Sequence, residues 1–194
     1  MKKLAYLIAL VVMASCGMQE KNEKQKWNED CKAIEDSAKV NTAGKTDIYL
    51  GFKFGMNDKE ILRHIKKLEK EGKAERDYAG RCVVPMIGPH GTEYKAVLGV
   101  EYYDDKARKY TFKTDGSGDY IMIFSAFEEA NKGVFSIYEN EGIKGYYMQI
   151  DNILCKFMQV LGTSIVSFSD APYIDLMEQE KDSIESARVD AYRM

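Results

Sequence analysis

The chain has 194 residues, with 28 Lys and Arg against 31 Asp and Glu, which gives a net charge of −3 at pH 7. A mildly acidic chain with mixed charges lacks the basic face that neutralises phosphates, so we expect no nucleic-acid partner. The length suffices for one domain with a substantial core, even after a leader is removed.

The first residues have the layout of a secretory signal. Lys2 and Lys3 precede an apolar run from Leu4 to Ala14, which is too short to span a bilayer. Met13-Ala14-Ser15-Cys16 then resembles the lipobox of bacterial lipoproteins, in which the signal is cut before Cys and that Cys carries acyl chains. We therefore predict a signal peptide over 1–15 and lipidation of Cys16. The alternative is a cut near Ala14 that leaves Cys16 as a free thiol.

The predicted anchor also indicates a location. Two or more acyl chains hold a protein stably on a membrane, whereas one is marginal. Because no Asp follows Cys16, we expect the outer membrane, with the side that the protein faces left open. The expected domain organisation is a lipid-anchored tether over 16–46 and a single α+β domain over 47–194. The helical spacing of Trp27, Cys31, Ile34 and Ala38 predicts a short helix within the tether.

The first part of the domain has clear local signals. Asn57 with Glu60 three residues later predicts a capped helix, which Gly72 ends. Alternating apolar residues over 93–103 predict a strand with one buried face: Tyr94, Ala96, Leu98, Val100 and Tyr102. A turn at 104–106 leads to a second strand, on which Tyr110 and Phe112 point inward.

The second part is predicted from apolar runs. YIMIFSAF (120–127) is apolar on both faces and predicts a central strand, and GVFSIYE (133–139) predicts another. GYYMQIDNILCKFMQVLG (145–162) has helical spacing, and TSIVSFS (163–169) is typical of a strand. A final helix is expected from Tyr173 onward, with a hairpin as the alternative. The predicted fold is α+β: an antiparallel meander of about four to six strands against two or three helices.

Motifs for catalysis or cofactor binding are weak. The stretch Thr114-Asp115-Gly116-Ser117-Gly118 is similar to the middle of an EF-hand loop, but the first and twelfth positions hold Lys113 and Phe124, so we expect a hairpin turn there and no calcium. His64 and His90 lack the partners of a metal site, and no cofactor is expected.

Three cysteines remain beyond Cys16: Cys31, Cys82 and Cys155. They allow at most one disulfide, and whether any two pair is left open. His90 in a Pro/Gly loop and Tyr103 on the polar side of its strand are the candidate binding surface for a sugar, peptide or partner protein.

The stretch GFKFGMNDKEILRHIKKL (51–68) resembles the element "G-M-S/T-x-x-E/Q-V" of small envelope lipoproteins. These include the β-barrel assembly lipoprotein of the SmpA type and β-lactamase-inhibitor-like modules. It is also similar to the start of many envelope lipoproteins of the Bacteroidetes kind. The resemblance implies a non-catalytic module that acts through contacts at the envelope.

From these observations we expect a lipid-anchored binding or scaffolding protein of the outer membrane, with a protein or glycan partner. Two alternatives remain. One is an envelope hydrolase with an unrecognised cleft that uses Cys155, His64 or His90. The other is an inhibitor or immunity-type lipoprotein that blocks another protein.

Overall fold

The computed structural model describes residues 23–140 and 142–191, with side chains as far as residue 182. Within these residues four helices surround one eight-stranded antiparallel sheet. The helices are an N-terminal helix over 23–40, α2 (Asp58–Lys70), α3 (Asp119–Ala130) and α4 (Ile174–Ala191). The strands are β1 (Glu75–Arg76), β2 (Cys82–Ile87), β3 (Glu93–Tyr103), β4 (Lys106–Thr114), β5 (Val134–Asn140), β6 (Ile143–Ile150), β7 (Ile153–Val160) and β8 (Thr163–Asp170). Two short 3-10 turns, η1 (Pro89–Gly91) and η2 (Ala171–Tyr173), complete the described elements.

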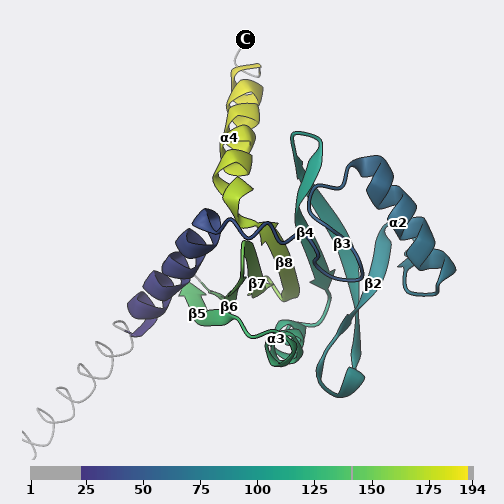
Figure 1. Ribbon diagram of the computed structural model, residues 1–194, viewed down its shortest axis with the longest axis horizontal. Helices are drawn as coiled ribbons and strands as arrows, with labels where there is room; N and C mark the ends of the chain where they lie inside the picture. Colours follow the sequence, from purple (N-terminus) through teal and green to yellow (C-terminus); the bar gives the residue numbers. More distant parts are fainter. Residues whose placement is uncertain (1–22, 141, 192–194) are drawn as a thin grey trace, which may run out of the picture.

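The sheet is built from two units with the same element order. α2 is followed by β1 to β4, and α3 is followed by β5 to β8. The strand order β1-β2-β3-β4-β8-β7-β6-β5 places the last strand of each unit at the centre, where β4 and β8 pair antiparallel. Two meanders thus form one continuous sheet with β1 and β5 at its edges (Figure 1).

One face of the sheet, here called the inner face, carries the main core. Alternate residues of β4, such as Tyr110 and Phe112, are fully buried there against α2, α3 and the segment 48–56. Helix α2 contributes its buried stripe of Ile61, Ile65 and Leu68. Since alternate residues of a strand point to opposite faces, Lys109, Thr111 and Lys113 lie on the other side, the outer face.

The N-terminal helix and α4 lie on the outer face. Ile34 and Ala38 of the helix form a second apolar cluster with Leu154 of β7 and Ala171 of η2. The helix begins beside the β5–β6 turn and runs toward the opposite end of the sheet, where α4 projects outward (Figure 1). The outer face is therefore covered on its β5–β7 side and bounded by α4.

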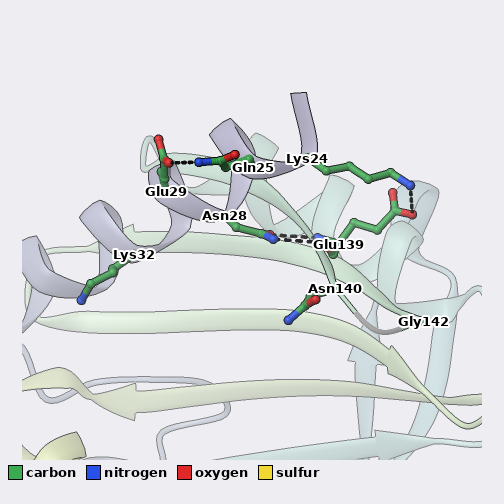
Figure 2. A pocket seen from close by; sticks show the side chains of 8 residues that line it. All are labelled: Lys24, Gln25, Asn28, Glu29, Lys32, Glu139, Asn140 and Gly142. Atoms are coloured by element: carbon green, nitrogen blue, oxygen red, sulfur yellow. Dashed lines mark hydrogen bonds and ion pairs between the residues drawn. The ribbon is translucent and has the colours of Figure 1, made fainter. Parts of the chain in front are cut away.

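The N-terminal helix also covers the free edge of β5. The Asn28 side chain donates to the Glu139 carbonyl (3.2 Å) and accepts from the Glu139 amide (3.4 Å), as Figure 2 shows. The Cys31 thiol donates to the Ile137 carbonyl at 3.3 Å. An uncovered edge strand is a template for pairing with another chain, so these contacts protect it.

The predicted strand count is wrong, because the sheet has eight strands and not four to six, although the class is α+β. The stretch 120–127 is not a central strand but most of α3. Its outward residues Ile121 and Met122 are apolar and 40% and 43% exposed, so the sequence shows no polar face.

The stretch 145–162 is not a helix but the hairpin of β6 and β7. Its strands have apolar residues on both faces because the core covers one and the N-terminal helix covers the other. This double coverage removes the period of two, and the remaining spacing imitates a helix.

The stretch 114–118 is also not a hairpin turn, because it connects β4 to the start of α3. Neither Gly116 nor Gly118 has the positive φ that such a turn would need. Other local predictions are confirmed. Asn57 and Glu60 form a reciprocal capping box. The alternate residues of β3 face the core, and the chain after Tyr173 is helical.

The predicted helix in the tether exists and is longer than expected. It is described over 23–40, so residues 23–26, ahead of the predicted pattern that starts at Trp27, are helical as well. Residues 1–22, which include the predicted signal and Cys16, lie outside the described residues.

Candidate functional site

The outer face is open between the N-terminal helix and α4, and a groove of about 520 Å³ lies there. We call it the outer groove. Its floor crosses β3, β4, β8 and β7, and its wall is α4, with Met177 and Lys181 facing it. The pairing register aligns Gly99, Thr111, Ser167 and Lys156 in one row across these strands.

Small side chains make this row hollow. Gly99 has no side chain, and Thr111 and Ser167 fill little space above their strands. The next row places Lys113 and Met158 on either side of Ile165. The floor therefore offers hydroxyl groups beside apolar contacts, a mixture that suits an extended polar ligand lying across the strands.

Four lysines line the outer groove against two glutamates, although the whole chain is acidic. Glu101 accepts from Lys109 at 2.7 Å and also pairs with Lys181 of α4. Burial alone would raise the pKa of Glu101, but the hydrogen bonds from Lys109 and Lys181 outweigh it and hold that pKa below its ordinary value. Among the residues with described side chains, Lys113 has no carboxylate partner.

A second charged cluster closes the groove at the N-terminal helix. Lys156 lies 3.0 Å from Glu35 of the helix and 4.5 Å from the ring centre of Tyr147. Burial opposes the charge on Lys156, yet Tyr147 and Glu35 raise its pKa above the ordinary value. Lys39 joins Glu35 (3.0 Å) to Asp175 of α4 (2.7 Å). These ion pairs connect both bounding helices and leave Lys156 already paired.

The structure separates the two predicted binding residues. His90 lies exposed in η1, just before β3, and Tyr103 is the last residue of that strand. Eleven residues of strand span about 35 Å, so they do not form one surface. Tyr103 contacts the ring of Tyr173 (6.1 Å between centroids), and the Arg108 guanidinium lies 3.5 Å from the centre of that ring. Tyr103 therefore belongs to a packed cluster.

Two residues of the hydrolase alternative, Cys155 and His64, occupy packed positions. Cys155 is fully buried on the inner face, and burial raises the pKa of its thiol far above the ordinary value. The His64 ring packs edge-on against Phe52 at 4.8 Å, and its Nε2 lies 2.8 Å from the Leu50 carbonyl. Cys155 therefore has neither access nor a thiolate for attack.

The sequence held one signal for the outer groove. On β4, Lys109, Thr111 and Lys113 alternate with the inward Tyr110 and Phe112, which predicts one polar face. That polar row becomes a groove only because β8 pairs beside β4 and α4 rises next to it, and a single sequence does not reveal that pairing.

All three cysteines beyond Cys16 are free and buried. Within the described part of the chain, no cluster of three or more His, Cys, Asp or Glu side chains is suited to hold a metal ion. No helix in that part combines the length and the apolarity needed to cross a membrane. No protein-family model, no curated protein and no solved structure matches the chain.

Proposed function

We propose that the chain is a lipid-anchored, non-catalytic binding protein of the outer membrane and that the outer groove is its contact surface. The single observation that carries this proposal is the open groove across the sheet centre, with its excess of lysines and the unpaired Lys113. The partner is an extended acidic segment of a protein or a glycan.

Electrostatics favours such a partner. The chain as a whole is mildly acidic, and the Lys113 charge, which no described carboxylate neutralises, attracts an anionic group to the groove. Lys109 and Lys181 are held near Glu101, which fixes their positions before a ligand arrives. Thr111 and Ser167 add hydroxyl groups that can donate to or accept from the ligand.

The proposed location follows from Cys16. Lipid attached there would place the start of the N-terminal helix near the membrane, and α4 lies at the other end of the sheet. A membrane fractionation of Cys16→Ala tests this part, because the unlipidated protein should leave the membrane. Retention on the membrane would contradict the anchor.

Site-specific photo-crosslinking in native envelopes tests the groove. A photoreactive side chain replaces either Glu178, on the exposed wall of the outer groove, or Lys66, on the exposed face of α2. We expect an adduct from position 178 and none of the same size from position 66. Sensitivity of the adduct to protease or to glycan hydrolases distinguishes a protein partner from a glycan.

Charge reversal then tests the role of the lysines. With the photoreactive group at 178, Lys113→Glu should lower the adduct yield by about tenfold, which corresponds to about 1.4 kcal/mol. Lys66→Glu is the matched control and should leave the yield unchanged. Two outcomes would show that the outer groove is not the contact surface. One is the same adduct in equal yield from positions 178 and 66, and the other is an adduct yield at position 178 that Lys113→Glu leaves unchanged.

A further inference from the structure

Two hairpin turns lie at the end of the sheet where the N-terminal helix begins. Asn140 pairs with Ile143 around the β5–β6 turn, and Val160 pairs with Thr163 around the β7–β8 turn. Because Lys144 of β6 pairs with Gln159 of β7, these turns are neighbours. Lys24 at the start of the helix lies 3.1 Å from Glu139, just before the first turn (Figure 2).

Leu161 forms the tip of the β7–β8 turn and is unusual there. Its relative exposure is 101%, so no described part of the chain covers it. Its φ is 50°, in the left-handed region that Asn, Asp and Gly tolerate better than a bulky apolar residue. The position thus combines backbone strain with an exposed leucine, and the fold itself gains no contact from that side chain.

The turns at the opposite end of the sheet have a different chemistry. Asp104 and Asp105 form the β3–β4 turn, and Asp151 lies in the β6–β7 turn. All three are exposed. At the end near the helix start, Lys144 of β6 is exposed on the strand next to β7, which ends just before Leu161. The β7–β8 turn thus ends in an exposed leucine, and the turns at the other end carry exposed aspartates, so the apolar tip suits a bilayer interface and the charged tips suit water.

The chain length brings the leucine within reach of a membrane. Between Cys16 and residue 23 a fully extended chain spans at most about 25 Å. If Cys16 carries lipid, residue 23 is held within that distance of the bilayer surface, and the contact of Lys24 with Glu139 keeps the turn end of the sheet next to it. An exposed leucine at the tip of a turn can then enter the interface between headgroups and acyl chains.

We propose that Leu161 inserts into the bilayer beside the lipid anchor and is a second membrane contact of the protein. This inference rests on the proposed lipidation of Cys16. With both contacts at the same end of the sheet, that end faces the membrane, and α4 and the acidic turns point away from the surface. The outer groove then lies between these two ends and stays accessible.

The test uses the full lipidated protein in vesicles of phosphatidylethanolamine and phosphatidylglycerol. Leu161→Cys carries an environment-sensitive fluorophore, and Asp105→Cys carries the same label as the matched control. The native thiols Cys31, Cys82 and Cys155 are buried, so the introduced cysteine is labelled selectively in the folded protein. We expect a blue shift and quenching by spin-labelled lipid at position 161, and neither at position 105.

Flotation of the same vesicles separates the two proposals. If the protein floats with the vesicles but the label at 161 shows no shift, the insertion is wrong and the anchor stands. If the protein does not float, both fail. Equal shifts at 161 and 105 would overturn the proposed orientation, because they would show that the body lies on the membrane without a preferred end.

Discussion

Two asparagine side chains in this protein act as partners for the backbone. Asn28 bonds to both the amide and the carbonyl of Glu139. In the same way Asn152 accepts from the Lys45 amide (2.7 Å) and donates to the Lys45 carbonyl (3.1 Å). Each side-chain amide thus replaces the neighbouring strand that these segments lack, which lowers the cost of leaving backbone groups unpaired.

Asp170 extends one of these contacts into a buried network. It accepts from Asn152 at 3.1 Å and from Arg108 at 2.8 Å, and its side chain is only 8% exposed. Asp170→Ala leaves the Arg108 charge without its partner in a mostly buried site. Because removal of one member of a buried pair is strongly unfavourable, we expect a loss of about 3 kcal/mol in the free energy of unfolding.

Urea denaturation measures this loss, and Asp36→Ala is the matched control. Asp36 is 54% exposed and pairs with Lys32 on the surface of the N-terminal helix, so its removal should cost less than about 0.5 kcal/mol. Similar losses for the two variants would show that the Asp170 network adds no stability.

The buried thiol of Cys31 should make the free energy of unfolding depend on pH in the alkaline range. Burial raises the pKa of its thiol from 9.0 to about 11. The folded state therefore keeps the proton longer than the unfolded state, so the contribution of Cys31 is complete below pH 9 and is lost as the pH rises to about 11. The whole effect is about 3 kcal/mol.

The measurement compares the wild type with Cys31→Ala by urea denaturation at about pH 8 and about pH 10.5. Other groups titrate in both proteins, so only the difference between their slopes reports on Cys31. We expect the wild type to lose about 2 kcal/mol more than Cys31→Ala over this range. Parallel slopes would mean that the thiol ionises in the folded state as easily as in the unfolded chain.

At the scale of elements, the N-terminal helix protects the edge of the sheet. It is attached to β5 mainly through Asn28 and Cys31 and to β7 through its apolar stripe. An edge strand that loses its cover exposes unpaired amides and carbonyls to other chains. The helix that leads toward the proposed anchor therefore also shields the edge of β5 from pairing with another chain.

Asn28→Ala tests this role. We expect amide hydrogen exchange to accelerate by about tenfold over 134–140, since the loss of about 1.4 kcal/mol of local stability changes an opening equilibrium by that factor. Gln25→Ala is the matched control, because within the described residues the Gln25 side chain bonds to Glu29 on the same exposed helix surface and not to β5. Unchanged exchange in Asn28→Ala would show that the edge does not depend on this side chain.

Whether an element could be predicted from sequence depended on how many of its faces are covered in the fold. Helix α2 and strand β3 each have one buried and one solvated face, so Asn57, Ile61 and Ala96 were assigned correctly. Strands β6 and β7 are covered on both faces, and Leu154 and Phe157 therefore suggested a helical stripe that does not exist. The prediction for α3 was wrong for a related reason. Its exposed side is apolar, so the stretch looks like a strand that is buried on both faces.

The candidate site was less predictable than the fold. Lys113 and Thr111 were on a visible polar face of β4, but Ser167 and Lys181 come from elements that only tertiary structure brings alongside. His90 and Tyr103 were chosen for their local exposure and lie at opposite ends of β3. A groove is a property of several strands together, and single-sequence patterns report on one strand at a time.

On the scale of the whole molecule, the seam between β4 and β8 joins the two units. Phe112 of β4 and Phe168 of β8 meet edge-on at 5.8 Å, and both are almost completely buried. Phe168 also contacts Phe127 of α3 at 5.3 Å. The core of the first unit is thus continuous with that of the second, and we expect the molecule to unfold as one cooperative unit.

Phe168→Ala tests this continuity, because it removes the ring that both units share. Truncation of a buried aromatic side chain leaves a cavity at the seam and should cost about 4 kcal/mol in the free energy of unfolding. Hydrogen exchange followed by mass spectrometry should show peptides of β3 and of β7 losing protection together, since the seam stabilises both. Leu62→Ala, at a side chain that is 44% exposed on α2, is the control and should cost less than about 1 kcal/mol. If only β7 loses protection, the two units are separate cooperative units that happen to pair at β4 and β8.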